Sequence, residues 1–300
     1  MNLKNKIKIV LENPSIVLDK VINLPIFKNM SDQAYLKMRY KIDTGETLNL
    51  ENPTKFNEKL QWLKLHDHNP QYTKMVDKFE VKEYMKELIG EDFIIPTLGV
   101  WDSFDEIDFN MLPNQFVLKS THDSGGVVIC KDKANLDIEN ARKVINKSLK
   151  RNYFYSGREW PYKNVKPRII AEKYMVDESG YELKDYKIFL FSGKAKYIQV
   201  DFDRFTDHHR NFYSTDWEYV PFTTLYPTNP DRKIERPQCL SQLLHISEKI
   251  AKSLDDPKFL RVDLYVINNS VYFGEVTFYH GSGYEKFYPE AWNEKLGSLI

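Results

Sequence analysis

The sequence has few cysteines, no excess of either charge sign and no long apolar run. Only two of its 300 residues are cysteines, which excludes a disulfide framework or a cysteine-rich zinc site and fits a reducing cytoplasm. Lysine plus arginine and aspartate plus glutamate both number 43, so the formal net charge is zero. Dedicated nucleic-acid binders usually carry a strong basic excess, so we expect no nucleic-acid partner.

A membrane-spanning segment is also missing. The most apolar early stretch, residues 21–27, is short and interrupted by Asn23 and Pro25, whereas a spanning helix needs about 20 apolar residues. The first residues have neither the apolar core nor the small-residue cleavage site of a signal peptide. Lys4, Lys6 and Lys8 lie among isoleucine and valine residues, which is compatible with a short solvated helix or with a peripheral contact at the inner face of the cell membrane.

What the sequence does have is many aromatic side chains and a change of pattern along the chain. Tyrosine and phenylalanine number 19 and 18, which favours large cores or a substrate surface lined with rings. Apolar spacing predicts helices over 32–40, 54–65, 71–88, 136–149 and 242–254. Strand-type runs cover 115–119, 127–130, 168–175, 185–191, 194–203, 260–267 and 271–278. Helices first, then a largely antiparallel set of strands, indicate an α+β fold.

The last predicted hairpin carries the most informative side chains. A three-residue loop over 268–270 would place Asp263 opposite Glu275 and Arg261 opposite Thr277, whereas a two-residue loop would send the two carboxylates to opposite faces. Two opposed carboxylates in an apolar hairpin need a cation. Mg²⁺ prefers oxygen ligands and often takes one or two carboxylates together with substrate phosphates. The alternative is an ordinary surface ion pair within the hairpin.

A polar loop and an apolar strand supply two further candidates. The loop over 120–126 follows a strand that ends in Lys119 and contains Ser124, Gly125 and Gly126. Its small residues and backbone N–H groups could hold phosphate beside the lysine, although it matches neither the Walker loop nor the dinucleotide fingerprint. A plain hairpin turn is the alternative. The apolar strand ends in Glu172 and Lys173, where backbone groups could pair with the edge of a base.

Taken together and in this order, these pieces resemble the ATP-grasp fold, and more closely the TupA-like ATP-grasp proteins of teichuronopeptide and surface-polysaccharide biosynthesis. The similar runs extend over nearly the whole chain: 56–64, 72–78, 158–160, 166–174, 204–205, 210–213 and 281–289. The resemblance implies two α+β lobes that grip ATP, with a helical N-terminal extension. It divides the chain into the extension (1–66), an N-terminal part of the fold (67–110), a small lobe with the phosphate loop (111–175) and a C-terminal lobe with the magnesium site (176–300).

The resemblance also implies roles for individual residues in nucleotide binding. The lysines expected near phosphates are Lys78, Lys119 and Lys187, and the loop with Ser124, Gly125 and Gly126 corresponds to the mobile lid over the triphosphate. The residues expected at the adenine are Glu172, Lys173 and Met175, and either Glu182 or Asp185 is expected at the ribose. The loop differs from the family pattern at Asp123, where a glycine is expected.

The implied metal ligands and catalytic arginines come from the second half of the chain. Asp263 and Glu275 match the Mg²⁺ carboxylates, and Thr277 stands where the family has asparagine. Arg261 matches the arginine that steadies the reacting acyl group. The cations Arg204 and Arg210, near aromatic runs, could hold an acidic sugar or an amino-acid carboxylate by bidentate pairing; simple surface solvation is the alternative.

The activity implied is that of an ATP- and Mg²⁺-dependent ligase that joins a carboxylate to an amine through an acyl phosphate. Its substrates would be an amine or amino acid and a uronic-acid-type sugar of a capsular or other surface polysaccharide. One alternative is a glycosyltransferase that holds a nucleotide sugar with Asp201-Phe202-Asp203. A kinase with the same ATP site is another. A non-catalytic carbohydrate-binding protein would leave the aligned lysines and carboxylates unexplained.

Overall fold

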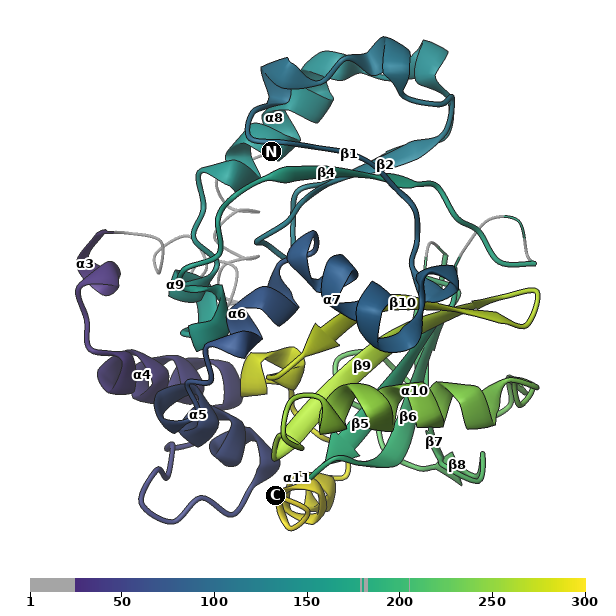
Figure 1. Ribbon diagram of the computed structural model, residues 1–300. Coiled ribbons are helices and arrows are strands. Elements are labelled where there is room, and N and C mark those ends of the chain that lie inside the picture. The colour runs from purple at the N-terminus through teal and green to yellow at the C-terminus, as the bar shows by residue number, and fades with distance from the viewer. Residues whose placement is uncertain (1–24, 179, 181–182, 205) are drawn as a thin grey trace, which may run out of the picture.

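Two antiparallel β-sheets lie one above the other in the computed structural model of the protein (Figure 1). The structure describes residues 25–300 apart from 179, 181–182 and 205. The lysine-rich segment over 4–9 and the ribose candidate Glu182 therefore lie outside the described residues. The expected α+β class is confirmed.

The small sheet has the strand order β1-β4-β2-β3, and all its pairs are antiparallel. Its strands are β1 (Thr97–Trp101), β2 (Phe116–Ser120), β3 (Val127–Cys130) and β4 (Ile169–Lys173). Helix α8 (Ile138–Leu149) packs on β2 and β3. Alternate residues of β2, such as Phe116 and Leu118, are fully buried in a core shared with Ile145 of α8, as expected for a sheet with one covered face.

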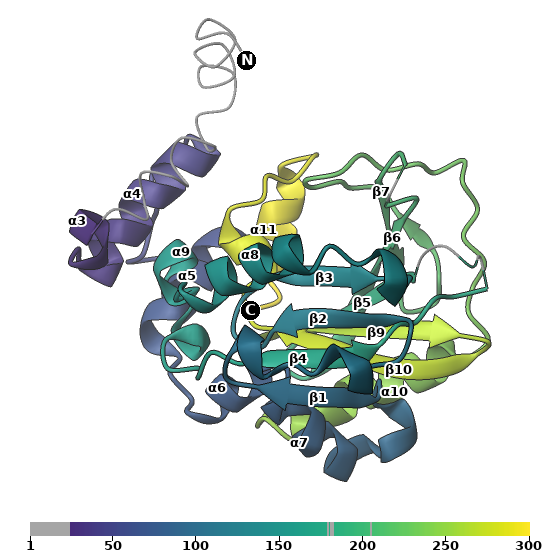
Figure 2. The same ribbon diagram turned by 90° about the horizontal axis from the view of Figure 1, so that it is seen from above.

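The large sheet has the order β10-β9-β5-β6-β7-β8. Its strands are β5 (Asp185–Phe191), β6 (Lys194–Phe202), β7 (His209–Ser214), β8 (Tyr219–Val220), β9 (Phe259–Ile267) and β10 (Ser270–Thr277). Helix α10 (Leu240–Lys252) covers one face, and its apolar stripe with Leu243, Ile246 and Ile250 packs into the main core. Seen from above, the small sheet overlies β9 and β10 (Figure 2), so the uncovered sides of the two sheets face each other.

The remaining helices come before β1, between β3 and β4, or at the C-terminal end of the chain. They are α3 (Pro25–Lys28), α4 (Asp32–Thr44), α5 (Phe56–His66), α6 (Gln71–Val76), α7 (Glu80–Ile89), α9 (Phe154–Gly157) and α11 (Ala291–Gly297). Short 3₁₀ turns are η1 (Glu91–Phe93), η2 (Phe104–Glu106), η3 (Phe109–Met111), η4 (Lys133–Asn135), η5 (Trp160–Tyr162) and η6 (His280–Gly283). Helix α5 inserts Phe56, Leu60 and Leu63 into the main core, so this part of the N-terminal region is integral to the fold. Within the described part of the chain, no helix is long and apolar enough to cross a bilayer.

The helix predicted over 71–88 is wrong as a single element, because the chain leaves the helical path between α6 and α7. The Asp77 carboxylate accepts hydrogen bonds from the backbone N–H groups of Phe79 (2.9 Å) and Glu80 (3.3 Å). An aspartate at this point caps the start of a new helix, and its other oxygen is held by Arg168 at 2.6 Å. The break places the Asp77-Lys78 turn beside the small sheet, where the N–H of Lys78 donates to the carbonyl of Thr121.

Asp263 and Glu275 are paired in the hairpin of β9 and β10, as predicted, but the loop is shorter than the predicted three residues. The loop has two residues, Asn268 and Asn269, both with positive φ, which is the turn type that matches strand twist. An extra residue, Gly274, forms a bulge between Phe273 and Glu275. The bulge shifts the pairing by one residue, so Glu275 lies opposite Asp263 after all.

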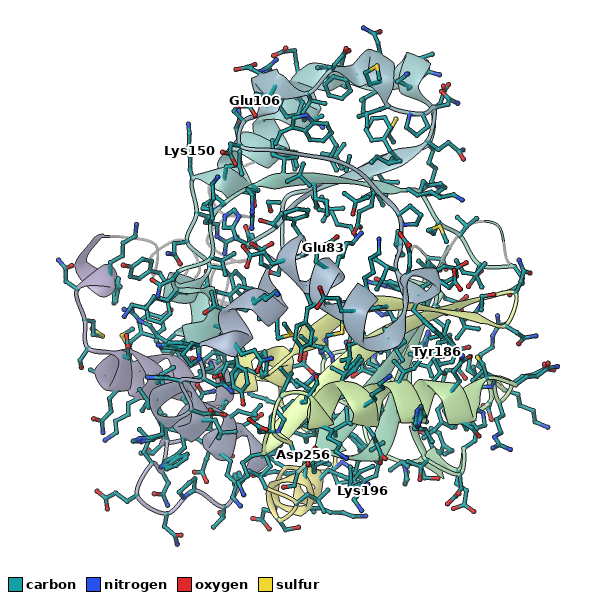
Figure 3. All side chains as sticks on the ribbon, viewed as in Figure 1. Glu83, Glu106, Lys150, Tyr186, Lys196 and Asp256 are labelled. Atoms are coloured by element: carbon teal, nitrogen blue, oxygen red, sulfur yellow. The ribbon has the colours of Figure 1, made fainter. Side chains whose placement is uncertain are left out.

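Charged side chains of both signs are distributed over the outside of the molecule. Figure 3 shows Glu106 beside the small sheet and Lys196 at the opposite end of the molecule. The two cysteines are free, and Cys130 is buried at the end of β3, as the apolar run before it predicts.

Candidate active site

A carboxylate held by two lysines lies on the small sheet. Glu172 on β4 is buried, and its two oxygens pair with different lysines: Oε2 lies 2.5 Å from Lys119 Nζ on β2, and Oε1 contacts Lys82 Nζ on α7. Strands β2 and β4 are neighbours, so their register brings Lys119 and Glu172 together. Lys82 also donates to the carbonyl of Ile95 at 2.7 Å. The cluster therefore fixes two positive charges at one place on the sheet.

The charges in this cluster determine the protonation of Glu172. Burial alone would raise the pKa of Glu172, but the charges of Lys119 and Lys82 outweigh it and lower the pKa to about 2. Lys82 was not among the residues selected from the sequence. The sequence did contain a sign that Lys82 is buried. Lys82 lies between Val81 and Met85, which are both on the buried face of α7. The aliphatic part of its side chain therefore runs along the apolar face of the helix.

A second cluster of charges lies on the large sheet. Asp263 on β9 is buried, with Oδ1 2.6 Å from Arg261 Nε and Oδ2 at 2.8 Å from Arg261 Nη2 and 2.6 Å from Lys187 Nζ on β5. Strand pairing places Lys187 directly opposite Asp263. Burial would raise the pKa of Asp263, but the two cations outweigh this effect and lower it. The expected grouping of Arg261, Asp263 and Lys187 is thus present.

Glu275 and Thr277 complete this cluster on β10. Glu275 lies opposite Asp263, and its side chain is 48% exposed, with Oε1 3.5 Å from Arg261 Nη2. Thr277 Oγ1 accepts a hydrogen bond from the same nitrogen at 3.1 Å. All three predicted metal ligands therefore offer oxygen on one side of the hairpin, which is the donor chemistry of Mg²⁺. No group of three histidine, cysteine, aspartate or glutamate side chains suited to a metal occurs among the described residues.

Charges from both sheets influence the protonation of Tyr265 on β9. The pKa of Tyr265 is raised well above its usual value by Asp185, by burial, by Glu275 and Asp263 and also by Glu172. The first three acids belong to the large sheet and Glu172 to the small one. Carboxylates of both sheets thus raise the pKa of Tyr265, which fits the stacked arrangement of the sheets in Figures 1 and 2.

Charges of both clusters also influence Lys78. Burial lowers the pKa of Lys78. The charge of Lys119 on the small sheet lowers it further, and the charge of Glu275 on the large sheet opposes this effect. The Nζ of Lys78 donates to the backbone carbonyl of Asp123 at 2.6 Å. Lys78, which the family resemblance implies near phosphates, thus ties the turn between α6 and α7 to the predicted phosphate loop.

The predicted phosphate loop has a firmly held base and an exposed tip. Asp123 is buried, accepting from the N–H of Gly125 at 3.2 Å and from Ser148 Oγ at 2.8 Å, with Arg151 at 3.8 Å. The carboxylate that replaces the expected glycine is therefore used inside the loop. Ser124 at the tip is exposed.

Gly126, at the other end of the loop, has a conformation that only glycine adopts easily. Its φ is +63°, and a Cβ there would lie 2.5 Å from Ser148 Cβ and 2.7 Å from Ser120 Oγ. The N–H of Ser120 donates to the carbonyl of Gly126 at 3.1 Å, which closes the loop.

The residues expected at the adenine and the ribose come from both sheets. Lys173 ends β4 with an exposed side chain, and its N–H donates to the carbonyl of Pro96 at 3.0 Å. Met175 follows it and is half-buried. Asp185 at the start of β5 is buried and pairs with Lys187 at 3.2 Å and with Arg204. Asp185 is thus the described member of the two ribose candidates.

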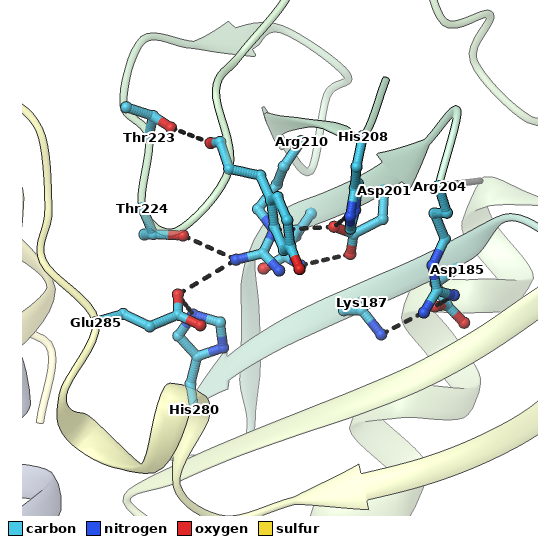
Figure 4. A network of polar contacts seen from close by, with 12 residues as sticks. Asp185, Lys187, Asp201, Arg204, His208, Arg210, Thr223, Thr224, His280 and Glu285 are labelled. Atoms are coloured by element: carbon cyan, nitrogen blue, oxygen red, sulfur yellow. Dashed lines mark hydrogen bonds and ion pairs between the residues drawn. The ribbon is translucent and has the colours of Figure 1, made fainter. Parts of the chain in front are cut away.

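Arg204 and Arg210 both form ion pairs with carboxylates of the protein. Arg204 is 41% exposed and pairs with Asp185. Arg210 on β7 is buried, with Nε 3.0 Å from Asp201 Oδ1 and Nη1 3.2 Å from Glu285 Oε2 (Figure 4). Its charge is balanced by two carboxylates, which is the condition for burying a guanidinium.

The Asp-x-Asp sequence does not form a paired carboxylate site. Asp201 on β6 is buried and accepts from Arg210, from Gln199 Nε2 at 2.7 Å and from His208 Nε2 at 2.9 Å. Burial would raise the pKa of Asp201, but Arg210 and Lys187 lower it strongly. Asp203 lies beyond the end of β6, where its φ is positive. The carboxylate of Asp201 is thus committed to internal contacts.

Comparison with protein families identifies the class of the molecule. The family model described as TupA-like ATPgrasp matches residues 58–300. The chain belongs to the TupA-like ATP-grasp family, as its resemblance implied, and the ATP-grasp fold follows from this membership. A comparison with curated proteins finds no match.

The chain is similar to several solved ligase and synthetase structures at low sequence identity. It is similar to D-alanine–D-alanine ligase from Bacillus anthracis complexed with ATP (17% identity, TM-score 0.42, 75% of this chain and 57% of that one). It is also similar to the enzyme from Helicobacter pylori (17%, 0.42, 82% and 69%) and to the ADP complex of purK, an N5-carboxyaminoimidazole ribonucleotide synthetase (14%, 0.46, 82% and 56%). The chain thus spans little more than half the length of the first and third of these proteins.

Proposed function

We propose that the protein is an ATP-dependent carboxylate–amine ligase that forms an amide through an acyl phosphate. The observation that carries the proposal is the pair of charge clusters on facing sheets of a TupA-like ATP-grasp chain. Lys119 on the small sheet and Lys82 on α7 present positive charge around Glu172. Lys187 and Arg261 present it from the large sheet, next to the carboxylates of the hairpin. Lysines and an oxygen-rich metal site are what a triphosphate requires.

The proposed reaction has two steps. An oxygen of the substrate carboxylate attacks the γ-phosphorus of ATP, a bond from that oxygen to phosphorus forms, and ADP leaves. The amine nitrogen then attacks the acyl carbon, phosphate leaves, and the nitrogen loses a proton to give the amide. The lysines neutralise phosphate charge, and Arg261, already fixed by Asp263, stabilises negative charge on the acyl oxygen.

The proposal includes Mg²⁺ held by Asp263, Glu275 and Thr277. When bound there, the ion would neutralise charge on the phosphates. The half-exposed Glu275 is the ligand most open to such an ion, since Asp263 is already bound by Lys187 and Arg261. Lys187 and Arg261 balance the carboxylates in the absence of the ion.

The substrates we propose are an amine or amino acid and a uronic-acid-type sugar of a surface polysaccharide. The support is the family itself, whose description names TupA, together with the resemblance to proteins of teichuronopeptide biosynthesis. Two free cysteines and the use of ATP support a cytoplasmic location. In this proposal Arg204 is the arginine more open to an acidic substrate, because Arg210 is buried between two carboxylates.

Thermal unfolding with added ligands tests the class of substrate first. A ligand present at one hundred times its dissociation constant stabilises the folded state by about 2.7 kcal/mol. We expect ATP or ADP with Mg²⁺ to raise the melting temperature and UDP-sugars to leave it unchanged. A shift only with a UDP-sugar would favour the glycosyltransferase. Mass spectrometry of the product then separates a ligase, which needs the amine, from a kinase, which leaves a phosphorylated acceptor.

Lys119→Ala tests the phosphate lysine. A charge-assisted contact to phosphate contributes roughly 1.5–3 kcal/mol, so we expect the Kd for ATP to rise tenfold or more. Lys196→Ala is the matched control, because Lys196 is exposed at the far end of the molecule. Isothermal titration calorimetry measures both. An unchanged Kd for Lys119→Ala would remove this residue from the site.

Asp263→Asn tests the metal ligand, with Asp203→Asn as a substitution of the same kind outside the cluster. A neutral amide at position 263 cannot balance Arg261 and Lys187 or bind Mg²⁺ as strongly, so we expect Mg²⁺-dependent release of ADP to be lost. We expect Asp203→Asn to be tolerated. Circular dichroism checks that both variants fold. Full activity of the first variant would contradict the metal assignment, and complete inactivity of the second would support the glycosyltransferase.

A further inference from the structure

One contact of Arg261 leads away from the metal carboxylates and into the interior. Its Nη1 lies 3.0 Å from Nδ1 of His280, the first residue of η6. The other guanidinium nitrogens are occupied by Asp263 and Thr277. Since a guanidinium can only donate, Nδ1 of His280 must be the acceptor and carries no proton. His280 is therefore present as the tautomer protonated at Nε2.

The second nitrogen of His280 faces an acid. Nε2 lies 3.2 Å from Oε2 of Glu285, within ion-pair distance of the carboxylate but without a hydrogen bond to it. Burial lowers the pKa of His280 against the attraction of Glu285, with Arg261 and Arg210 lowering it further, which keeps the ring neutral. The ring is buried and packs edge-on against Phe189 of β5, with centroids 4.8 Å apart.

The backbone around His280 is also held in place. The three residues that follow it all have positive φ: Gly281 (54°), Ser282 (53°) and Gly283 (67°), and a non-glycine residue in this conformation needs support from its surroundings. That support comes from α5, where Gln61 Nε2 and Lys64 Nζ donate to the carbonyl of Ser282 at 3.0 and 2.8 Å.

Glu285 links His280 to strand β7 of the large sheet. Its Oε2 also lies 3.2 Å from Arg210 Nη1 on β7, and Arg210 in turn pairs with Asp201 on β6 (Figure 4). A continuous row of polar contacts thus runs from Asp201 through Arg210, Glu285 and His280 to Arg261. Every member is buried or nearly so.

We propose that His280 and Glu285 are positioning residues, which hold the Arg261 guanidinium in the orientation needed to stabilise the acyl transition state. This inference rests on the proposed ligase function. Arg261 is fixed on one side by Asp263, but Asp263 is also a metal candidate and is shared with Lys187. The Nδ1 acceptor of His280 gives the guanidinium a second fixed point that does not depend on the metal.

A matched pair of substitutions isolates the Nδ1 acceptor. His280→Asn keeps an acceptor oxygen where Nδ1 lies, and His280→Leu has the same branching without it. Both lose the Nε2 atom near Glu285, and the acceptor oxygen for Arg261 is present only in His280→Asn. We expect His280→Leu to lower kcat roughly 10- to 100-fold, as for the loss of a hydrogen bond to a charged group. We expect the KM for ATP to stay within about threefold, and His280→Asn to recover most of the lost kcat.

The two variants also have a readout that needs no substrate. Crystal structures should show Arg261 Nη1 at its wild-type position in His280→Asn and displaced in His280→Leu. Equal kcat in the two variants, or an unmoved guanidinium in His280→Leu, would overturn the positioning role. If the wild-type protein neither binds ATP nor releases ADP with any carboxylate and amine, the proposed function fails, and the crystal structures still decide whether His280 positions Arg261.

Discussion

Replacing Glu172 by glutamine tests how strongly the small-sheet cluster contributes to stability. The change keeps the shape of the side chain and removes the charge that Lys82 and Lys119 share. The pKa of Glu172 is lowered from its ordinary value of 4.5 to about 2, because the two lysines outweigh the effect of burial. A pKa that differs by one between the folded and unfolded states corresponds to about 1.4 kcal/mol. We therefore expect Glu172→Gln to lower the free energy of unfolding by about 3 kcal/mol at pH 7.

The lowered pKa of Glu172 also determines how this loss depends on pH. A carboxylate with a lowered folded-state pKa contributes its full stability above the unfolded pKa and loses it as the pH falls towards the folded pKa. The difference between wild type and Glu172→Gln should therefore be constant from pH 7 to about 5. It should shrink progressively between about pH 4.5 and pH 2.

Urea unfolding followed by circular dichroism measures this difference at each pH. The control is Glu106→Gln, since Glu106 is exposed beside the small sheet, and we expect it to change stability by less than about 0.5 kcal/mol. A loss below about 1 kcal/mol for Glu172→Gln at pH 7, or a loss that does not depend on pH between about 5 and 3, would show that the two lysines do not stabilise the charged form of Glu172.

Two glycine substitutions test the backbone that shapes the site. In Gly274→Ala the new Cβ would lie 2.9 Å from the carbonyl oxygen of Asp263, so we expect β10 to shift, the melting temperature to fall and ADP release to drop; an unchanged melting temperature would mean the bulge has room. In Gly126→Ala the positive φ and the Ser148 contact should destabilise the phosphate loop by about 1–3 kcal/mol and raise the Kd for ATP. Wild-type affinity in that variant would separate the loop from nucleotide binding.

Local sequence patterns predicted most of the strands, because their signals lie within a few residues. The alternation of buried residues in β2 and the hairpin of β5 and β6 are of this kind. The break between α6 and α7 was missed, because apolar spacing continues through Asp77 and only its capping bonds reveal the interruption. Gly274 was a readable signal for a bulge, since glycine inside a strand often marks one. The predicted loop length was wrong, but the predicted pairing of Asp263 with Glu275 is confirmed. The bulge adds the residue that the shorter loop lacks.

The charged contacts of the site could not be predicted in the same way. Lys82 and Glu172 form an ion pair although they are 90 residues apart in the sequence, and Arg210 and Glu285 are 75 residues apart. Such partners depend on how the two sheets and α7 pack, which no local pattern describes. The family resemblance supplied candidate roles for Lys119, Lys187 and Arg261. It did not reveal which carboxylate balances each cation.

The bulge at Gly274 has a consequence for comparing this chain with its relatives. A relative without the bulge has one residue fewer between its counterparts of Phe273 and Glu275, and its two carboxylates still face each other across the hairpin. An alignment that runs through β10 without a gap would then match Glu275 to a residue on the other face of the strand. A single-residue gap at position 274 is therefore the physically correct alignment, and conservation of the acid can be judged only after that gap is placed.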